Sequence, residues 1–189
     1  MADQPFRPSG PRLSPVWPLN DELREIMKGG IDNAAGRPLN IFGTMAHNPR
    51  LLKRFMPFGG YFLNRGLIPA REREIVILRV GHNAGSVYEF GQHTIIGRRE
   101  GLTEPEIAAL VRDPGAHSWT SRERALIDMT DEICADNCVS DATWKRLRDD
   151  WDDAQLCELV LLVGEYRMVA GFLNTMGVQL DEETPGWPV

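Results

Sequence analysis

The sequence has few cysteines, no long apolar run and no excess of positive charge, and each of these features excludes a class of protein. Three cysteines among 189 residues, without the spacing of a disulfide framework, fit a reducing cytoplasm. The longest stretch without a charged side chain, Met168–Leu180, has 13 residues, whereas a membrane-spanning helix needs about 20. With 21 basic against 27 acidic side chains, bulk charge does not favour a nucleic acid or an anionic membrane as partner.

Patterns that alternate apolar and polar residues are too short to predict a β-strand. Signals for helix ends are dense instead. Asn48 precedes Pro49 as an N-cap would, Thr103 and Thr120 open capping boxes, and Gly101 follows a run that should stop there. We therefore predict an all-α protein with about eight helices. They are expected at about 21–28, 49–64, 69–82 and 86–100, from about 103, 120 and 140 onward, and at about 152–175.

One glutamate stands in the middle of an apolar helix face. On a wheel of about 100° per residue, Glu74 lies between Ile77 and Leu78. An unpaired carboxylate is unfavourable in such a place. Glu74 is therefore expected to be paired with a buried donor, to be held there for chemistry, or both.

The next predicted helix offers partners for Glu74. Ser86, Glu89 and His93 are spaced i, i+3 and i+7, so they lie on one face. If that face packs on Glu74, two carboxylates, an imidazole and a hydroxyl meet in one apolar pocket, and burial would raise a carboxyl pKa toward neutrality. A plainer interpretation stays open. Glu89 and His93 would then form a simple helix pair worth about 0.3–0.5 kcal/mol, and Glu74 a buried salt bridge to an arginine.

These residues belong to a recognisable pattern. The segments Arg73–Gly81, Gly85–His93 and Gly101–Ile107 closely resemble the carboxymuconolactone decarboxylase family. That family shares a fold with the alkylhydroperoxidase D proteins, so the resemblance implies an alkylhydroperoxidase D-like helical fold. It is close over about residues 39–112 and looser to about Asp181.

The resemblance also suggests how the chain is divided. Residues 39–181 would form the carboxymuconolactone decarboxylase-like helical domain, preceded by a Pro-rich N-terminal arm and first helix (1–38) and followed by a C-terminal tail (182–189). Met1–Pro18 contains five prolines and no apolar run, so we do not expect a signal peptide there. We expect the arm to be extended, or to wrap around a neighbouring subunit.

Family membership would imply a homo-oligomer, a trimer or hexamer, with the active site near a subunit interface. In the peroxidase branch of the family, a glutamate is followed by a Cys-x-x-Cys pair and then a histidine. When the pattern is aligned on Glu74 and His93, Ser86 and Glu89 hold the two cysteine positions. Serine and glutamate cannot cycle through sulfenic acid and disulfide. Thiol peroxidase activity is therefore not expected at this site.

The remaining cysteines and a metal site are weaker possibilities. Cys134 and Cys138 lie outside the motif and are expected to be structural or incidental thiols, and Cys157 is expected in the core. Di-iron helical bundles use Glu-x-x-His in two copies, whereas Glu89 and His93 are four residues apart and have no second copy. We predict no metal and no cofactor.

We predict a cytoplasmic lyase of the carboxymuconolactone decarboxylase type. It would decarboxylate or isomerise a small carboxylated lactone or a related acid from aromatic breakdown. His93 would move the proton, Glu89 would set its tautomer, and Glu74 would act as a second carboxylate. Ser86 would bind the substrate, and no nucleic acid or membrane partner is expected. Two alternatives stay open: an alkylhydroperoxidase-like antioxidant that uses the cysteines outside the motif, and a non-catalytic oligomer that binds a small ligand.

Overall fold

The computed structural model describes residues 6–28, 33 and 35–188. In this part of the chain it contains nine α-helices, one short 3-10 helix and no β-strand, which confirms the all-α prediction. None of these helices is both long and apolar enough to cross a membrane. The α-helices are α1 (Asp21–Ile26), α2 (Asn40–Met45), α3 (Pro49–Asn64), α4 (Ala70–Asn83), α5 (Val87–Arg99), α6 (Glu104–Arg112), α7 (Ser121–Asp136), α8 (Asp141–Asp150) and α9 (Asp153–Met176).

The helix signals in the sequence miss α2, so the predicted number of about eight helices is one too low. Helix α2 has only six residues, its N-cap Leu39 makes no side-chain capping bond, and neither terminal turn carries a charge that favours a helix end. The other eight helices lie close to their expected places. Asn48, for example, caps α3 by accepting a hydrogen bond from the backbone N–H of Leu51, and Gly101 follows α5 with a φ of +89°.

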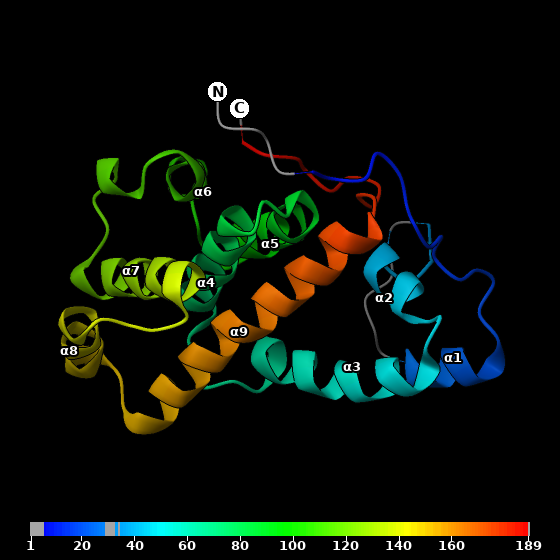
Figure 1. Cartoon of the computed structure of the whole chain (residues 1–189), viewed down its shortest axis with the longest axis horizontal. Coiled ribbons are helices and arrows are strands. Elements are labelled where there is room, and N and C mark those ends of the chain that lie inside the picture. Colours follow the sequence, from blue (N-terminus) through cyan, green and yellow to red (C-terminus); the bar gives the residue numbers. More distant parts are fainter. Residues whose placement is uncertain (1–5, 29–32, 34, 189) are drawn as a thin grey trace.

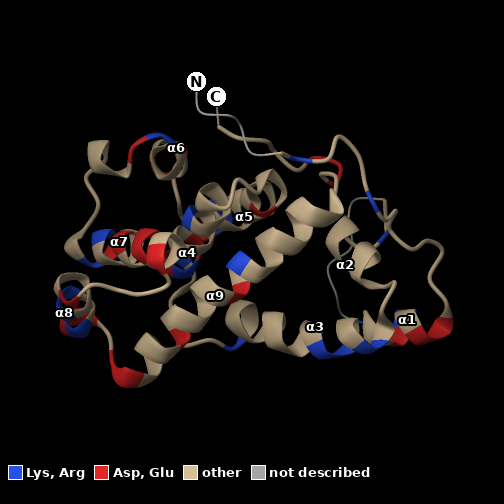
Figure 2. Ribbon diagram, viewed as in Figure 1, with Lys and Arg blue, Asp and Glu red and all other residues tan. Residues whose placement is uncertain are grey.

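Helix α4 lies at the centre of the fold. Eight of its 14 residues are buried, and it packs against α5, α6, α7 and α9. Figure 1 shows α9, the longest helix, crossing the molecule over this centre. Charged residues are frequent on α1, α7 and α8, whereas few lie along α9 (Figure 2).

Helices α4 and α5 form an antiparallel hairpin. At one end a Cβ on Gly81 would lie 3.2 Å from the backbone nitrogen of Phe90, and at the other a Cβ on Gly97 would lie 3.7 Å from the Cβ of Glu74. Glycine at position 81 lets the helices approach closely, whereas the distance at Gly97 is an ordinary van der Waals contact. This close approach brings the face of α5 that carries His93 against Glu74.

The described part of the N-terminal arm lies against its own chain. The backbone nitrogen of Arg12 donates to the Met176 carbonyl over 2.8 Å, and that of Val16 donates to the Gly43 carbonyl over 2.9 Å. The guanidinium of Arg7 donates to the Ala84 carbonyl over 2.7 Å. The described part of the arm therefore packs against α2, the end of α9 and the segment that follows α4. Residues 1–5, 29–32 and 34 of the predicted segment 1–38 lie outside the described residues.

Asp181, which directly precedes the C-terminal tail, binds to the same region through its carboxylate. Asp181 is 5% exposed and accepts hydrogen bonds from the backbone nitrogen of Asn40, the hydroxyl of Tyr88 and the amide of Gln92. These three groups belong to α2 and α5. Asp181 therefore connects α2 with α5 through hydrogen bonds. Both helices contribute residues to the cavity described below.

Cys134 is partly buried and packs against the core, whereas Cys138 and Cys157 are exposed. Cys157 is exposed, so its expected place in the core is wrong. The reason is that its apolar neighbours Val160 and Leu161 lie on the outer face of α9 and are themselves 40% and 58% exposed. Cys138 lies beyond the end of α7, because Asn137 adopts a left-handed conformation that stops the helix before it.

The loop between α3 and α4 depends on a buried glutamate of α9. Glu158 accepts hydrogen bonds from the backbone nitrogens of Leu67 and Ile68 over 2.8 and 3.2 Å and from the Tyr61 hydroxyl over 3.0 Å. Glu158→Ala should lower the free energy of unfolding by about 2 kcal/mol, since it leaves buried donors without an acceptor. Urea unfolding measures this. Asp149→Ala, at an exposed acid of α8, is the control and should change the value by less than about 0.5 kcal/mol; equal losses in the two variants would contradict the assignment.

Candidate active site

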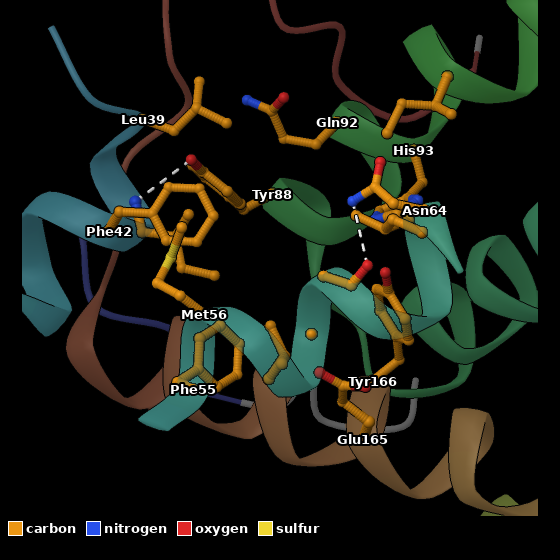
Figure 3. Close-up of a pocket in the computed structure, with 16 residues that line it drawn as sticks. Leu39, Phe42, Phe55, Met56, Asn64, Tyr88, Gln92, His93, Glu165 and Tyr166 are labelled. Carbon is orange, nitrogen blue, oxygen red and sulfur yellow. Dashed lines mark hydrogen bonds between the residues drawn. The ribbon is translucent and has the colours of Figure 1, made fainter. Parts of the chain in front are cut away.

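A cavity of about 250 Å³ lies between α2, α3, α5 and α9 (Figure 3). Its lining is mainly apolar, with a small number of polar groups, which is typical of sites for small molecules. The apolar and glycine residues are Leu39, Ile41, Phe42, Phe55, Met56, Gly59, Gly60, Leu63, Ile96 and Val169. The polar residues are Asn64, Tyr88, Gln92, His93, Glu165 and Tyr166.

In the cavity wall, His93 is held between two buried carboxylates. Its Nδ1 lies 2.7 Å from Oε2 of Glu74, and its Nε2 lies 3.3 Å from Oε1 of Glu89. Glu74 in turn accepts a hydrogen bond of 2.9 Å from Nε of Arg73. All four side chains are buried, and Glu74 has no exposed surface at all. The arrangement is a row of alternating charge that runs from Arg73 in the interior to Glu89.

These neighbours decide the protonation of the imidazole. Burial by itself lowers the pKa of His93, but the charge of Glu74 and the hydrogen bonds to Glu74 and Glu89 outweigh it and raise the pKa to about 9. At neutral pH the side chain is therefore an imidazolium, with one N–H directed at each carboxylate. A cationic acid in a cavity wall can donate a proton to a bound molecule.

The structure brings three of the four predicted site residues together. The wheel argument for the burial of Glu74 is confirmed, and its carboxylate pairs with Arg73 and with His93. Its role in chemistry stays a prediction. Ser86 is fully buried where α5 begins, its hydroxyl has no hydrogen-bond partner, and it is not among the residues that line the cavity. Its role in substrate binding stays a prediction.

Sequence reasoning missed Glu165, which reaches the cavity from α9 (Figure 3). Burial, and after it the charge of Glu89, raise the pKa of Glu165 to about 7, although His93 acts in the opposite direction. A signal for this residue is present in the sequence. Leu162 and Val169 lie three residues before and four residues after it, so the wheel argument applied to Glu74 also predicts that Glu165 is buried.

Tyr166, which follows Glu165, also lines the cavity beside the imidazole. Its ring centroid lies 4.9 Å from that of His93, and the two rings are nearly perpendicular, at 89°. Burial and the charges of Glu89 and Glu74 raise the pKa of its hydroxyl well above the usual value. Tyr166 therefore stays protonated and limits the movement of the imidazole.

Other reactive groups lie elsewhere. None of the three cysteines lines the cavity, and burial raises the pKa of the Cys134 thiol. Within the part of the chain that the structure describes, no three His, Cys, Asp or Glu side chains are grouped so that they could hold a metal ion. The ionisable side chains of the cavity wall are thus His93, Glu165 and the two tyrosines.

Residues 49–132 match the model of the carboxymuconolactone decarboxylase family. Over this segment, somewhat less than half of the chain, the sequence is similar to that family. The matched segment covers α3 to α6 and most of α7, and it contains Glu74, Glu89 and His93. The resemblance seen in the sequence is thereby confirmed. Glu165 lies beyond the family segment.

Comparison with similar proteins supports the fold and does not identify the reaction. An uncharacterised protein from Bacillus subtilis, YdfG, is 26% identical over 95 residues, which are 49% of this chain and 65% of that relative. The chain thus spans somewhat less than two thirds of its relative's length. A peroxidase-related protein of Ralstonia eutropha with an alkylhydroperoxidase AhpD core is 21% identical over 88% of both chains, with a TM-score of 0.74. A variant of the debrominase Bmp8 in complex with 2,3,4-tribromopyrrole is 15% identical over 90% of this chain and 91% of that one, with a TM-score of 0.72.

Proposed function

We propose that this protein is an enzyme that transfers protons on a small carboxylated lactone or a related acid, in a decarboxylation or an isomerisation. The observation that carries the proposal is the position of His93. This imidazolium has a pKa of about 9 and lies in the wall of an apolar cavity between two buried carboxylates. Two further points support it: the family is named for a decarboxylase, and a protein of the same fold holds a small ring compound.

The contacts of His93 suggest a division of labour. The Nδ1 contact with Glu74 is the shorter, at 2.7 Å, and Arg73 holds Glu74 from behind. Glu74 is therefore better placed than Glu89 to orient the ring, as the carboxylate does in a catalytic triad. The Nε2 contact with Glu89 is longer, at 3.3 Å. We assign the transferred proton to Nε2, and to Glu89 the stabilisation of the imidazolium when a proton from solvent restores it.

The reaction balances with His93 and one proton from solvent. When a substrate carboxylate leaves as carbon dioxide, the electrons of the broken C–C bond stay on the substrate as an enolate-like carbanion. The Nε2–H bond of His93 then breaks and a C–H bond forms, which leaves a neutral imidazole. In an isomerisation, Nε2 would first give its proton to one carbon of the substrate, and the neutral nitrogen would then take a proton from another carbon. A proton from solvent restores the imidazolium.

The test is turnover of a panel of small carboxylated lactones, 4-carboxymuconolactone among them. Carbon dioxide release reports decarboxylation, and exchange of substrate hydrogen for deuterium in heavy water reports isomerisation. The wild-type protein should act on at least one compound, and His93→Gln should reduce that rate by at least about 100-fold, the usual contribution of a general acid. Glutamine keeps a polar side chain of similar reach but cannot transfer the proton.

His117→Gln serves as the matched control, because His117 is a partly exposed histidine outside the cavity. It should leave the rate unchanged. Turnover that survives in His93→Gln would contradict the proposal. Saturable binding of a panel compound without any product in the wild type would favour the non-catalytic ligand-binding alternative. Peroxide consumption that disappears when Cys134 and Cys138 become serine would favour the antioxidant alternative, which no contact in the cavity supports.

We also propose that the protein acts as a homo-oligomer, a trimer or a hexamer, in the cytoplasm. Exposed apolar side chains on the outer surface of α8 and α9 support an assembly, since such patches often mark interfaces. Among them, Trp144, Leu161 and Met168 are 41%, 58% and 55% exposed. The three free cysteines fit the cytoplasmic location.

A further inference from the structure

Glu165 is a buried carboxyl group whose hydrogen-bonding capacity is unused. The residue is only 5% exposed, and its Oε2 has no hydrogen-bond partner. It lines the cavity together with His93 and Tyr166 (Figure 3). Buried polar groups nearly always have a partner. An unpartnered carboxyl in the wall of a cavity therefore indicates a group of a bound molecule as that partner.

The elements around Glu165 supply negative charge on one side only. Helix α5 faces it with Glu89, whose charge favours the protonated form, and with His93, whose charge favours the ionised form. Behind His93, the ion pair of Arg73 and Glu74 on α4 carries no net charge. The net effect, together with burial, keeps the pKa of Glu165 near 7.

The other walls near Glu165 carry no charge. On α3 the nearest residue is Gly59, whose added Cβ would lie 3.0 Å from Oε1 of Glu165. Along α9 itself, the adjacent cavity residue is Tyr166, a neutral phenol. None of the 16 residues that line the cavity, all in the described part of the chain, is a lysine or an arginine. The cavity has no cation free to neutralise an added charge, because His93 already faces two carboxylates.

We infer that Glu165 is the ligand-binding residue of this cavity, and that in its protonated form it donates a hydrogen bond to the carboxylate of a small monocarboxylic acid with an apolar body. The inference deepens the proposed function and rests on it in one respect: only that function makes the bound acid a substrate. It narrows the preferred ligands to compounds with one carboxyl group, so that 4-carboxymuconolactone, which has two, should be a poorer ligand than a lactone with one. A second carboxylate would lie against apolar side chains without a partner, which is unfavourable.

The chemistry follows from the two states of the carboxyl group. A protonated Glu165 donates an O–H to a carboxylate, and hydrogen bonds with one ionised partner are the stronger kind. An ionised Glu165 repels the same carboxylate across a cavity of low polarity. Binding of the anion therefore requires a proton on Glu165, and affinity should follow the fraction of the protein that carries it.

Isothermal titration with benzoate at pH 6 and pH 8 tests the inference. Benzoate is ionised at both values, and His93, with a pKa of about 9, stays mainly protonated. With a pKa of about 7, Glu165 is mostly protonated at pH 6 and mostly ionised at pH 8, so wild-type affinity should be roughly tenfold higher at pH 6. Glu165→Gln cannot ionise and should bind benzoate equally at both values.

Matched controls distinguish the protonation of Glu165 from general charge effects. Asp153→Asn removes an exposed acid at the start of the same helix and should keep the tenfold difference. Benzamide, which is uncharged, should lose the preference for pH 6, and terephthalate, with a second carboxylate, should bind at least tenfold more weakly than benzoate. A tenfold difference that persists in Glu165→Gln, or no benzoate binding at either pH, would overturn the inference.

The outcomes also distinguish this inference from the proposed function. If His93→Gln kept full turnover while benzoate binding stayed linked to Glu165, the proposed function would fail and the binding site would stand. If His93→Gln lost turnover while benzoate binding did not depend on pH, the proposed function would stand and the role of Glu165 would fail.

Discussion

Glu74→Ala is expected to lower the free energy of unfolding by about 3–5 kcal/mol, the range measured when one partner of a buried ion pair is removed. Glu74 is fully buried and is the shared partner of two cations, Arg73 at 2.9 Å and His93 at 2.7 Å. Without it, Arg73, which is 8% exposed, keeps a buried charge without its carboxylate partner. The imidazole loses the neighbour that keeps it protonated.

Chemical denaturation of the wild type and the variant at pH 7 measures the loss. Glu72→Ala is the matched control on the same helix, because its side chain faces Arg122 at 3.3 Å and is less buried. It should lose no more than about 1 kcal/mol. Glu74→Gln keeps the shape and should fold, yet it should lower the pKa of His93 and reduce turnover. Equal stability of Glu74→Ala and the wild type would show that the buried charges are compensated in another way.

Stability is expected to fall as the pH rises from about 5 to about 9. The folded protein raises the pKa of Glu165 from 4.5 to about 7 and that of His93 from 6.5 to about 9. A group whose folded pKa is raised stabilises the fold fully below its unfolded pKa and loses that contribution as the pH passes through the folded value. By linkage, each group loses a contribution of roughly 3 kcal/mol to the free energy of unfolding. Glu165 loses it between pH 4.5 and 7, and His93 between pH 6.5 and 9.

Two variants separate these contributions in urea unfolding at pH 5, 7 and 9. Glu165→Gln should remove most of the fall between pH 5 and 7, and His93→Gln most of the fall between pH 7 and 9. Surface carboxylates do not mimic the effect. Glu106, for example, has its pKa lowered to about 2 by the guanidinium of Arg71 and the hydrogen bonds of Thr103, against the effect of burial. Its contribution is lost only in acid, so a flat profile from pH 5 to 9 would contradict both assignments.

The local signals in the sequence determined much of the fold. Capping residues act on the backbone within three or four positions, so Asn48, Thr103 and Thr120 mark their helix starts without any knowledge of the rest of the chain. The helical period of 3.6 residues is equally local. It placed Glu74 on a buried face, and it predicts the same for Glu165 when applied there. Helix α2 lacks such signals and forms where Asp181 and the adjoining helices hold it.

The tertiary structure alone decided which of these faces meet. Glu74 and His93 are 19 positions apart and come together because α4 and α5 pack as an antiparallel pair, with Gly81 at their close approach. Glu165, 72 positions beyond His93, reaches the same cavity from α9. Periodicity shows that a side chain points inward, but not what it points at, and an apolar outer stripe such as that around Cys157 has the same period as a core face. The cavity, the charged row that includes His93 and the carboxyl group of Glu165 arise from the packing of helices distant in sequence, because burial and the distance between charges are properties of that packing.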